Sequence, residues 1–177
     1  MRRLLLLAGI LSVLLGGVAT VVRAQESPAM TDEHIARIKA SCVQAKVNMY
    51  QLHASDGLLR VNRGQLYQST STKLRAPFNS RVAHNQLDSS KLVAITSQYG
   101  GEFKSFDVSY RAYEEALSNV LELDCVKQPV AFYDGVADAR KKRQQVYIHS
   151  EELRKLTREY KEAFEAFSRD FNAKDAK

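Results

Sequence analysis

The stretch LVAITSQYGGEFKSFDVSYRAYEEALSNV, residues 92–120, decides the fold. Its apolar and aromatic residues recur in steps of three and four, the spacing that places side chains along one face of a helix. The stripe keeps its phase through Gly100-Gly101, which favours one long helix with a soft point over two helices joined by a loop. The cluster Asp88-Ser89-Ser90 is expected to cap its start. The stripe consists of Leu92, Ile95, Tyr99, Phe103, Phe106, Tyr110, Tyr113, Leu117 and Val120.

Two segments before this stretch also have helical patterns. The first begins after a cap at Thr31 or Asp32, and Ser55-Asp56-Gly57 is expected to end it. The second covers about residues 58–86, and Pro77 should kink or restart it. The apolar stripe of the first is Ile35, Ile38, Cys42, Ala45, Met49 and Leu52. The apolar positions of the second are Leu59, Leu66, Leu74, Phe78 and Val82.

The segment from Pro129 to Phe171 carries one apolar seam, which would reach about 60 Å as a single helix. Pro129 suits the first turn of a helix, and Ser150 is a candidate cap for a break into two helices. No strand-like alternation competes with these helices. The predicted fold class is therefore all-α, an up-down-up-down bundle of about four long helices over residues 32–172. Residues 173–177 are expected to be a disordered tail.

The first 24 residues are typical of an export segment. Arg2-Arg3 precedes the uncharged apolar run 4–22, and Val22-Arg23-Ala24 offers a small-residue cleavage site. The run is also long enough to span a bilayer, so an uncleaved membrane anchor is the alternative. Residues 25–31 then form a linker. Either way we expect an extracytoplasmic protein, in the periplasm, the cell-wall space or the medium, or anchored at the membrane.

The cysteines and the charge agree with such a location. Cys42 and Cys125 are the only two cysteines in 177 residues. In an oxidising compartment they predict one disulfide, with two buried free thiols as the alternative. Without the export segment the net charge falls from +6 to +3, with 23 basic and 20 acidic residues. A mildly basic domain is compatible with attraction to anionic envelope polymers or lipids.

Known catalytic and metal-binding patterns are missing from the sequence. It has no Glu-x-x-His pair of the kind that holds iron in helical bundles, no nucleophile elbow and no glycine-rich phosphate loop. His149 and Glu152 share a helix face, a pair that is more typical of solvated side chains. The acids around Glu151 and Glu159 alternate with Lys and Arg at helical spacing, as on an exposed face. We therefore predict no enzyme, no cofactor and no metal site.

One charge run is a candidate contact surface, namely Arg140, Lys141, Lys142 and Arg143. The export signal argues against nucleic acid as its partner. On a helix the four side chains spread around most of the circumference, so a solvated helix is the simplest interpretation. Contact with anionic lipid headgroups or wall polymers is the functional one.

Several short stretches resemble a group of known proteins. They are LRVNRGQLY at residues 59–67, Asp124-Cys125, Pro129, Phe132-Tyr133 and Ala139-Arg140. Together they are similar to uncharacterised exported helical proteins of ultrasmall, host-dependent bacteria of the Saccharibacteria type. The resemblance implies a bacterial envelope setting and a disulfide-bearing helical bundle. It implies no activity.

These observations predict a non-catalytic exported envelope protein that serves as a helical interaction or scaffold module, with an envelope protein as partner. The plentiful tyrosines keep an alternative open. A bundle lined by Tyr and Phe could hold a small apolar ligand in its core, and the protein would then be an extracytoplasmic carrier or sensor.

Overall fold

The computed structural model describes residues 30–175, so the expected export segment and most of the linker lie outside it. Within this range the chain is all-α and has no strand, as predicted. None of its helices is both long enough and apolar enough to cross a membrane. The elements in chain order are α1 (Asp32–Ser69), the π-helical turn η1 (Thr70–Arg75), α2 (Ala76–His84), α3 (Ser90–Glu122) and α4 (Pro129–Asp175).

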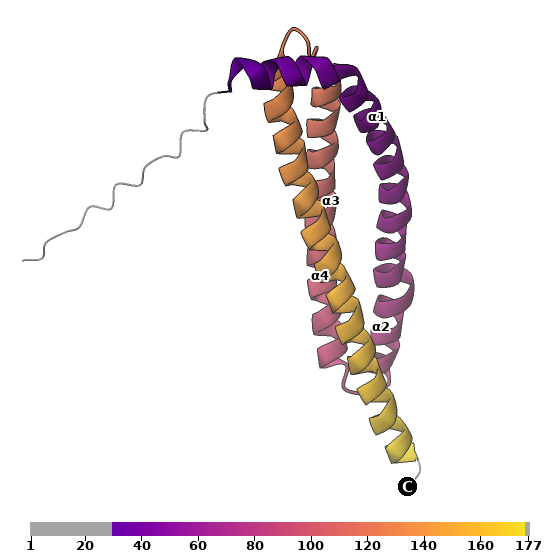
Figure 1. Ribbon diagram of the computed structural model, residues 1–177. Coiled ribbons are helices and arrows are strands. Elements are labelled where there is room, and N and C mark those ends of the chain that lie inside the picture. Colours follow the sequence, from indigo (N-terminus) through magenta and orange to yellow (C-terminus); the bar gives the residue numbers. More distant parts are fainter. Residues whose placement is uncertain (1–29, 176–177) are drawn as a thin grey trace, which may run out of the picture.

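Helices α3 and α4 form an antiparallel hairpin that holds most of the core (Figure 1). The predicted single helix through Gly100-Gly101 is confirmed, and its apolar stripe faces α4. Gly135 lets α4 approach α3 closely, since a Cβ at this position would lie 2.7 Å from the Cγ2 atom of Val120. The buried residues of the hairpin core include Tyr99, Phe106, Tyr110, Tyr113 and Leu117 from α3 and Leu153, Leu156 and Ala163 from α4.

The expected helix end at Ser55-Asp56-Gly57 is wrong, because α1 continues through this stretch to Ser69. Asp56 is buried and bonded to side chains of α3 and α4, and these tertiary contacts hold a helical backbone where local propensity predicts an end. From Asp32 to His84 the chain is helical without interruption and visibly bent (Figure 1). The predicted count of four long helices is therefore not confirmed in the described range.

Where Pro77 was predicted to kink or restart the helix, the structure has a π-helical turn within a continuous helical stretch. Proline has no N–H to donate and its ring crowds the carbonyl of the preceding turn. Just before it, the N–H of Ala76 bonds to the carbonyl of Ser71, five residues back, so the wider spacing of η1 absorbs the interruption. Pro77 itself then lies in the first turn of α2.

Helix α4 is continuous, so Ser150 does not begin a new helix. Its hydroxyl donates instead to the carbonyl of Val146, 2.9 Å away within the same helix. The helix also runs on to Asp175, which corrects the start of the expected tail at residue 173. Asn172-Ala173-Lys174 contains no glycine or proline that would end a helix there.

The first part of α1 lies across the end of the α3–α4 hairpin (Figure 1). Cys42 of α1 and Cys125 of the α3–α4 connection form the predicted disulfide, with 5.6 Å between their Cα atoms. Beside it, the Nζ atom of Lys46 donates to the carbonyl of Leu123 at 2.9 Å. A small apolar cluster with Val120 and Phe132 surrounds the bridge. The disulfide thus attaches α1 to the connection between the other two long helices.

Candidate binding cleft

The face that α1 and α2 turn toward the hairpin mixes apolar and polar side chains, which corrects part of the predicted core. Leu59, Leu66 and Leu74 were expected inside, but their side chains are exposed. The buried positions of the continuous helical stretch from Asp32 to His84 are instead Cys42, Asp56, Tyr67, Arg75, Asn79 and Val82. The physical reason is that this face meets hydroxyl and guanidinium groups of α3 and α4, which satisfy its polar side chains.

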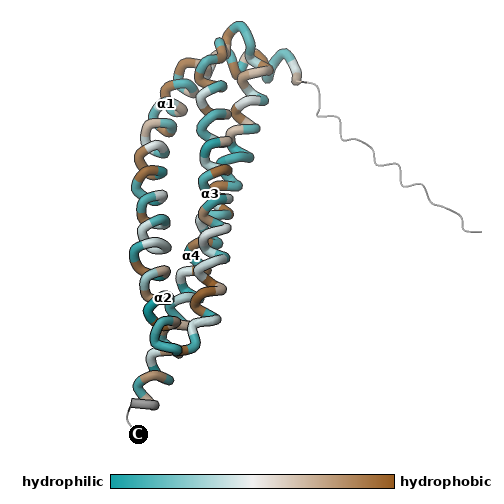
Figure 2. Tube along the Cα trace, turned by 180° about the vertical axis from the view of Figure 1, so that it is seen from behind, coloured by the Kyte–Doolittle hydropathy of each residue, from teal (hydrophilic) through white to brown (hydrophobic). Residues whose placement is uncertain are grey.

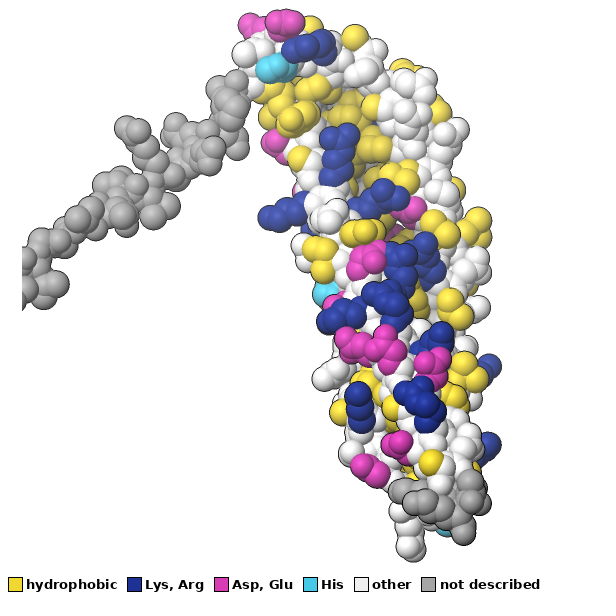
Figure 3. Space-filling view, turned by 60° about the horizontal axis from the view of Figure 1, so that its bottom comes forward, with side chains coloured by type: hydrophobic (Ala, Val, Ile, Leu, Met, Phe, Trp, Pro, Cys, Tyr) yellow, Lys and Arg dark blue, Asp and Glu magenta, His cyan; other side chains and the backbone are white. Residues whose placement is uncertain are grey.

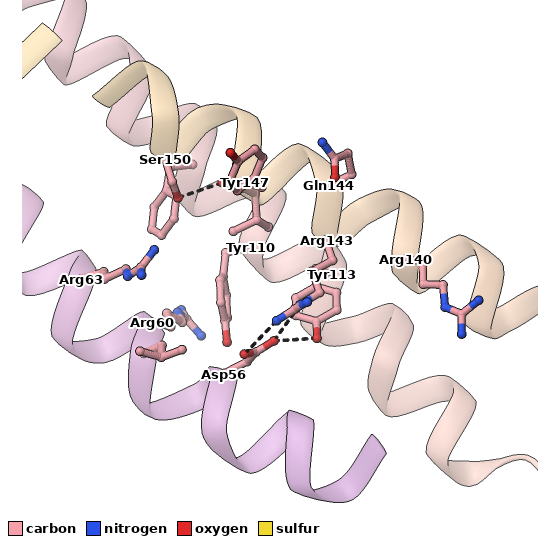
Figure 4. Close-up of a pocket in the computed structure, with 13 residues that line it drawn as sticks. Asp56, Arg60, Arg63, Tyr110, Tyr113, Arg140, Arg143, Gln144, Tyr147 and Ser150 are labelled. Carbon is pink, nitrogen blue, oxygen red and sulfur yellow. Dashed lines mark hydrogen bonds and ion pairs between the residues drawn. The ribbon is translucent and has the colours of Figure 1, made fainter. Parts of the chain in front are cut away.

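Asp56 joins α1, α3 and α4 at one point (Figure 4). The residue is 7% exposed. Its Oδ2 atom accepts a hydrogen bond from the Tyr113 hydroxyl at 2.8 Å and another from the Nε atom of Arg143 at 3.1 Å. A buried carboxylate needs such partners, and here each of the other two helices supplies one.

A cleft of about 390 Å³ opens beside this junction, with α1 and α4 as its walls and α3 as its floor (Figure 4). Aromatic side chains form the floor and four arginines stand around it. Arg60 lies over the ring of Tyr110, with its Cζ atom 5.2 Å from the ring centre, and donates to Glu114 at 2.8 Å. The principal lining residues are Asp56, Arg60, Arg63, Phe106, Tyr110, Tyr113, Arg140, Arg143 and Tyr147.

Two of the four arginines are not engaged by carboxylates. Arg143 is paired with Asp56, and Arg60 with Glu114. Arg63 on α1 and Arg140 on α4 make no ion pair with any part of the chain between residues 30 and 175. Basic side chains gather in the middle of the molecule in Figure 3. Because a guanidinium stays charged at any physiological pH, the cleft is a permanently positive site.

The structure divides the predicted basic run between two sides of α4. Arg140 and Arg143 line the cleft, whereas Lys142 pairs with Asp138 at 2.6 Å and borders a smaller hollow of about 260 Å³. Lys141 is exposed. Sequence reasoning missed Arg60 and Arg63 as site residues. Their signal was a spacing of three residues, which puts both on one helix face once the helix is known to continue past residue 57.

The other candidate residues behave as solvated or paired groups. The Nδ1 atom of His149 lies 2.5 Å from Oε1 of Glu102 on α3, not beside Glu152 as a metal pair would require. Glu152 pairs with Lys155 at 2.8 Å, and Arg154 pairs with Glu151. In the part of the chain that the structure describes, no group of three or more His, Cys, Asp or Glu is arranged to hold a metal ion.

The tyrosines of the cleft floor predict a loss of stability at high pH. Burial is the main cause that raises the pKa of Tyr110 to about 12, helped by the charges of Glu114 and Asp56. Burial and the hydrogen bond to Asp56 raise the pKa of Tyr113 as well. In the unfolded chain both should ionise near pH 10, so the unfolded state loses protons first and the native state is progressively destabilised above that pH.

The measurement is a pH titration of tyrosinate absorbance together with urea unfolding. Tyr110 and Tyr113 should be missing from the absorbance change at pH 11, because their pKa values are raised. Tyr110→Phe should weaken the dependence of stability on pH above 10. If the variant and the parent chain lose stability in parallel there, Tyr110 does not have the raised pKa.

The fold and the cleft define an all-α, disulfide-linked helical protein with an arginine-lined surface site. No family model, curated protein or solved structure matches this chain.

Proposed function

We propose that the protein is an exported, non-catalytic interaction module of the cell envelope, which holds an anionic group of its partner in the arginine cleft. The observation that carries this proposal is the pair of unengaged guanidinium groups, Arg63 and Arg140, on opposite walls over an aromatic floor. The export segment, which lies outside the described residues, supplies the envelope location. The similarity to Saccharibacteria-type exported proteins is in keeping with that location.

The chemistry of the cleft favours a phosphate group. Arginine presents a planar set of N–H donors that matches phosphate in a bidentate geometry. Of the four guanidinium groups around the cleft, only those of Arg60 and Arg143 are paired with carboxylates of the described residues. The positive charge in the cleft therefore exceeds the negative charge. Two envelope components carry phosphate groups. One is the headgroups of anionic lipids, including those around a membrane protein, and the other is the phosphate-containing polymers of the cell wall.

Binding assays with two phosphate probes test the proposal. The mature chain is mixed with phosphatidylglycerol vesicles in one assay and with long-chain polyphosphate in the other. Arg63→Gln/Arg140→Gln should weaken binding about tenfold or more, because the loss of even one guanidinium–phosphate contact of about 1.4 kcal/mol corresponds to a factor of ten. Vesicle binding alone would identify a lipid source, and polyphosphate binding alone a soluble polymer.

The matched control is Arg158→Gln/Arg169→Gln, which removes the same charge from exposed positions of α4 outside the cleft. It should change binding by less than about twofold. Equal losses in the two double variants would mean that general charge, not the cleft, binds the probe. A parent chain that binds neither probe at low salt would overturn the proposal.

The aromatic floor of Phe106, Tyr110 and Tyr113 favours a second candidate function, an extracytoplasmic carrier or sensor of a small apolar ligand. The four guanidinium groups above this floor would select against a purely apolar molecule. Native mass spectrometry of protein purified from its own host separates the two proposals. A stoichiometric apolar adduct that survives purification would favour the carrier, and a phosphate-bearing adduct the interaction module.

A further inference from the structure

Along residues 43–62, α1 turns its ionisable side chains inward. Lys46 donates to the carbonyl of Leu123, and the Nε2 atom of His53 lies 3.4 Å from the Ser118 hydroxyl. Asp56 and Arg60 bond to α3, through Tyr113 and Glu114 respectively. These are the only Lys, Arg, His, Asp and Glu residues of the stretch, so its outer face carries no charge at neutral pH. An ordinary surface helix has the opposite polarity, with charged groups outward.

The outer face of the same stretch is apolar. Its residues follow one another in steps of three and four, so they form one continuous stripe about 27 Å long, measured along the helix. The side chains are conspicuously open to solvent, with Val43 77% and Leu58 70% exposed. The stripe consists of Val43, Val47, Tyr50, Ala54, Leu58 and Val61. On one side it is flanked by the neutral polar residues Gln44, Asn48, Gln51, Ser55 and Asn62.

The figures show the same contrast. Apolar residues recur along the whole of α1 in Figure 2. In Figure 3 the upper right edge, over α1, is mainly white and yellow, whereas blue and magenta side chains crowd the middle of the molecule.

The stripe is symmetric about Ala54. Tyr50 and Leu58 lie four residues before and after it, and Val47 and Val61 lie seven residues before and after it. We infer that two copies of this chain pair through this stripe, with the two α1 helices antiparallel and a twofold axis at Ala54. Tyr50 of each copy then packs against Leu58 of the other, and Val47 against Val61, as a self-complementary interface requires. The small Ala54 side chain allows the helices to approach at the axis.

The charge distribution favours a second copy over a membrane surface as the occupant. Helices that lie on anionic membranes carry exposed Lys and Arg beside their apolar face. Here one edge of the stripe is neutral, and on the other edge Lys46 and His53 are half-buried and contact Leu123 and Ser118. The mature chain is basic, so most surfaces of two copies repel each other. The stripe is a long face on which two copies meet without bringing like charges together. This pairing also leaves the arginine cleft accessible, because the cleft lies on the inner side of α1.

Sedimentation velocity over about a hundredfold range of protein concentration tests the pairing. The parent chain should pass from monomer to dimer as concentration rises. Ala54→Glu places two carboxylates face to face at the axis and should shift the midpoint at least about tenfold higher. Ala137→Glu, at an exposed alanine of α4, is the matched control and should leave the midpoint unchanged. Circular dichroism verifies that each variant is folded.

Cross-linking tests the twofold axis itself. Ala54→Cys, treated with a mild oxidant, should give a disulfide-linked dimer in non-reducing electrophoresis, and Ala137→Cys should give far less. A parent chain that stays monomeric at all concentrations would overturn the inference, as would equal cross-linking of the two cysteine variants. A dimer that Ala54→Glu does not weaken would place the interface elsewhere and overturn it as well. Because none of these measurements involves a phosphate probe, they are independent of the proposed function of the cleft.

Discussion

Removal of the Cys42–Cys125 disulfide by the double substitution Cys42→Ala/Cys125→Ala should lower the free energy of unfolding by about 4–5 kcal/mol. The bridge joins residues 83 apart in sequence, and opening so long a loop releases much chain entropy in the unfolded state. Cys125 is fully buried, so some packing is lost in addition. The measurement is urea unfolding followed by circular dichroism, with the parent chain under oxidising and reducing conditions.

Reduction of the parent chain is the matched control, because the sequence contains no other cysteine. It should cost about as much stability as the double substitution. Hydrogen exchange should localise the native-state effect: amides in the first part of α1 should exchange faster, and those of the α3–α4 core should stay protected. A loss below about 1 kcal/mol would contradict the prediction and would mean that the Lys46–Leu123 bond and the apolar cluster hold α1 unaided.

The α3–α4 hairpin could be predicted from sequence because its burial follows helical periodicity. The stripe from Leu92 to Val120 is mostly buried where the spacing places it. The helix was correctly predicted to continue through Gly100-Gly101, because burial of the long apolar stripe outweighs the cost of two glycines in a helix. The disulfide could be predicted from the cysteine count and the expected export segment alone. In each case a single physical effect, apolar burial or loop closure, dominates the outcome.

The second predicted segment is helical, but its burial was predicted only in part. Val82 is buried and Phe78 packs against the core as expected. Its three leucines, however, are exposed, and the polar residues Asp56, Arg75 and Asn79 of the same continuous helical stretch are buried. Hydrophobic patterning assigns polar residues to solvent, and only their tertiary partners reverse that assignment. Those partners are far away in sequence: Arg143, for example, lies 87 residues beyond Asp56. The arginine cleft could not be predicted for the same reason. Its residues come from α1 and α4, and the periodicity of each helix does not show how the two helices pack.

Helix α1 therefore serves two kinds of contact. Its inner side carries the polar groups that build the cleft with α4 as well as core residues such as Met49 and Tyr67, while its outer side is apolar and presents the stripe around Ala54. Under the two proposals above, α1 would contact an anionic group on its inner side and a second copy of the chain on its outer side.

Among the buried polar residues of the helical stretch from Asp32 to His84, we expect substitution of Arg75 to have the largest effect on the free energy of unfolding. Its guanidinium lies between two tyrosine rings. Its Cζ atom is 4.1 Å from the ring centre of Tyr99 and 4.7 Å from that of Tyr160. Its Nη2 atom donates to the Thr157 hydroxyl at 2.9 Å, while Nη1 is buried and has no hydrogen-bond partner among the described residues. Burial lowers the pKa of Arg75, and the residue has no carboxylate partner in the described range.

Arg75→Ala should lower the free energy of unfolding by about 3 kcal/mol, because it leaves a cavity between the rings and removes both cation–π contacts. Arg75→Met should cost only about 1 kcal/mol, since it keeps the packing against Tyr99 and Tyr160 and relieves the desolvated charge. The exposed Arg158→Ala should change stability by less than about 0.5 kcal/mol. Urea unfolding of the three variants checks the order. If Arg75→Met were as damaging as Arg75→Ala, the charge and not the packing would hold η1 against α3 and α4.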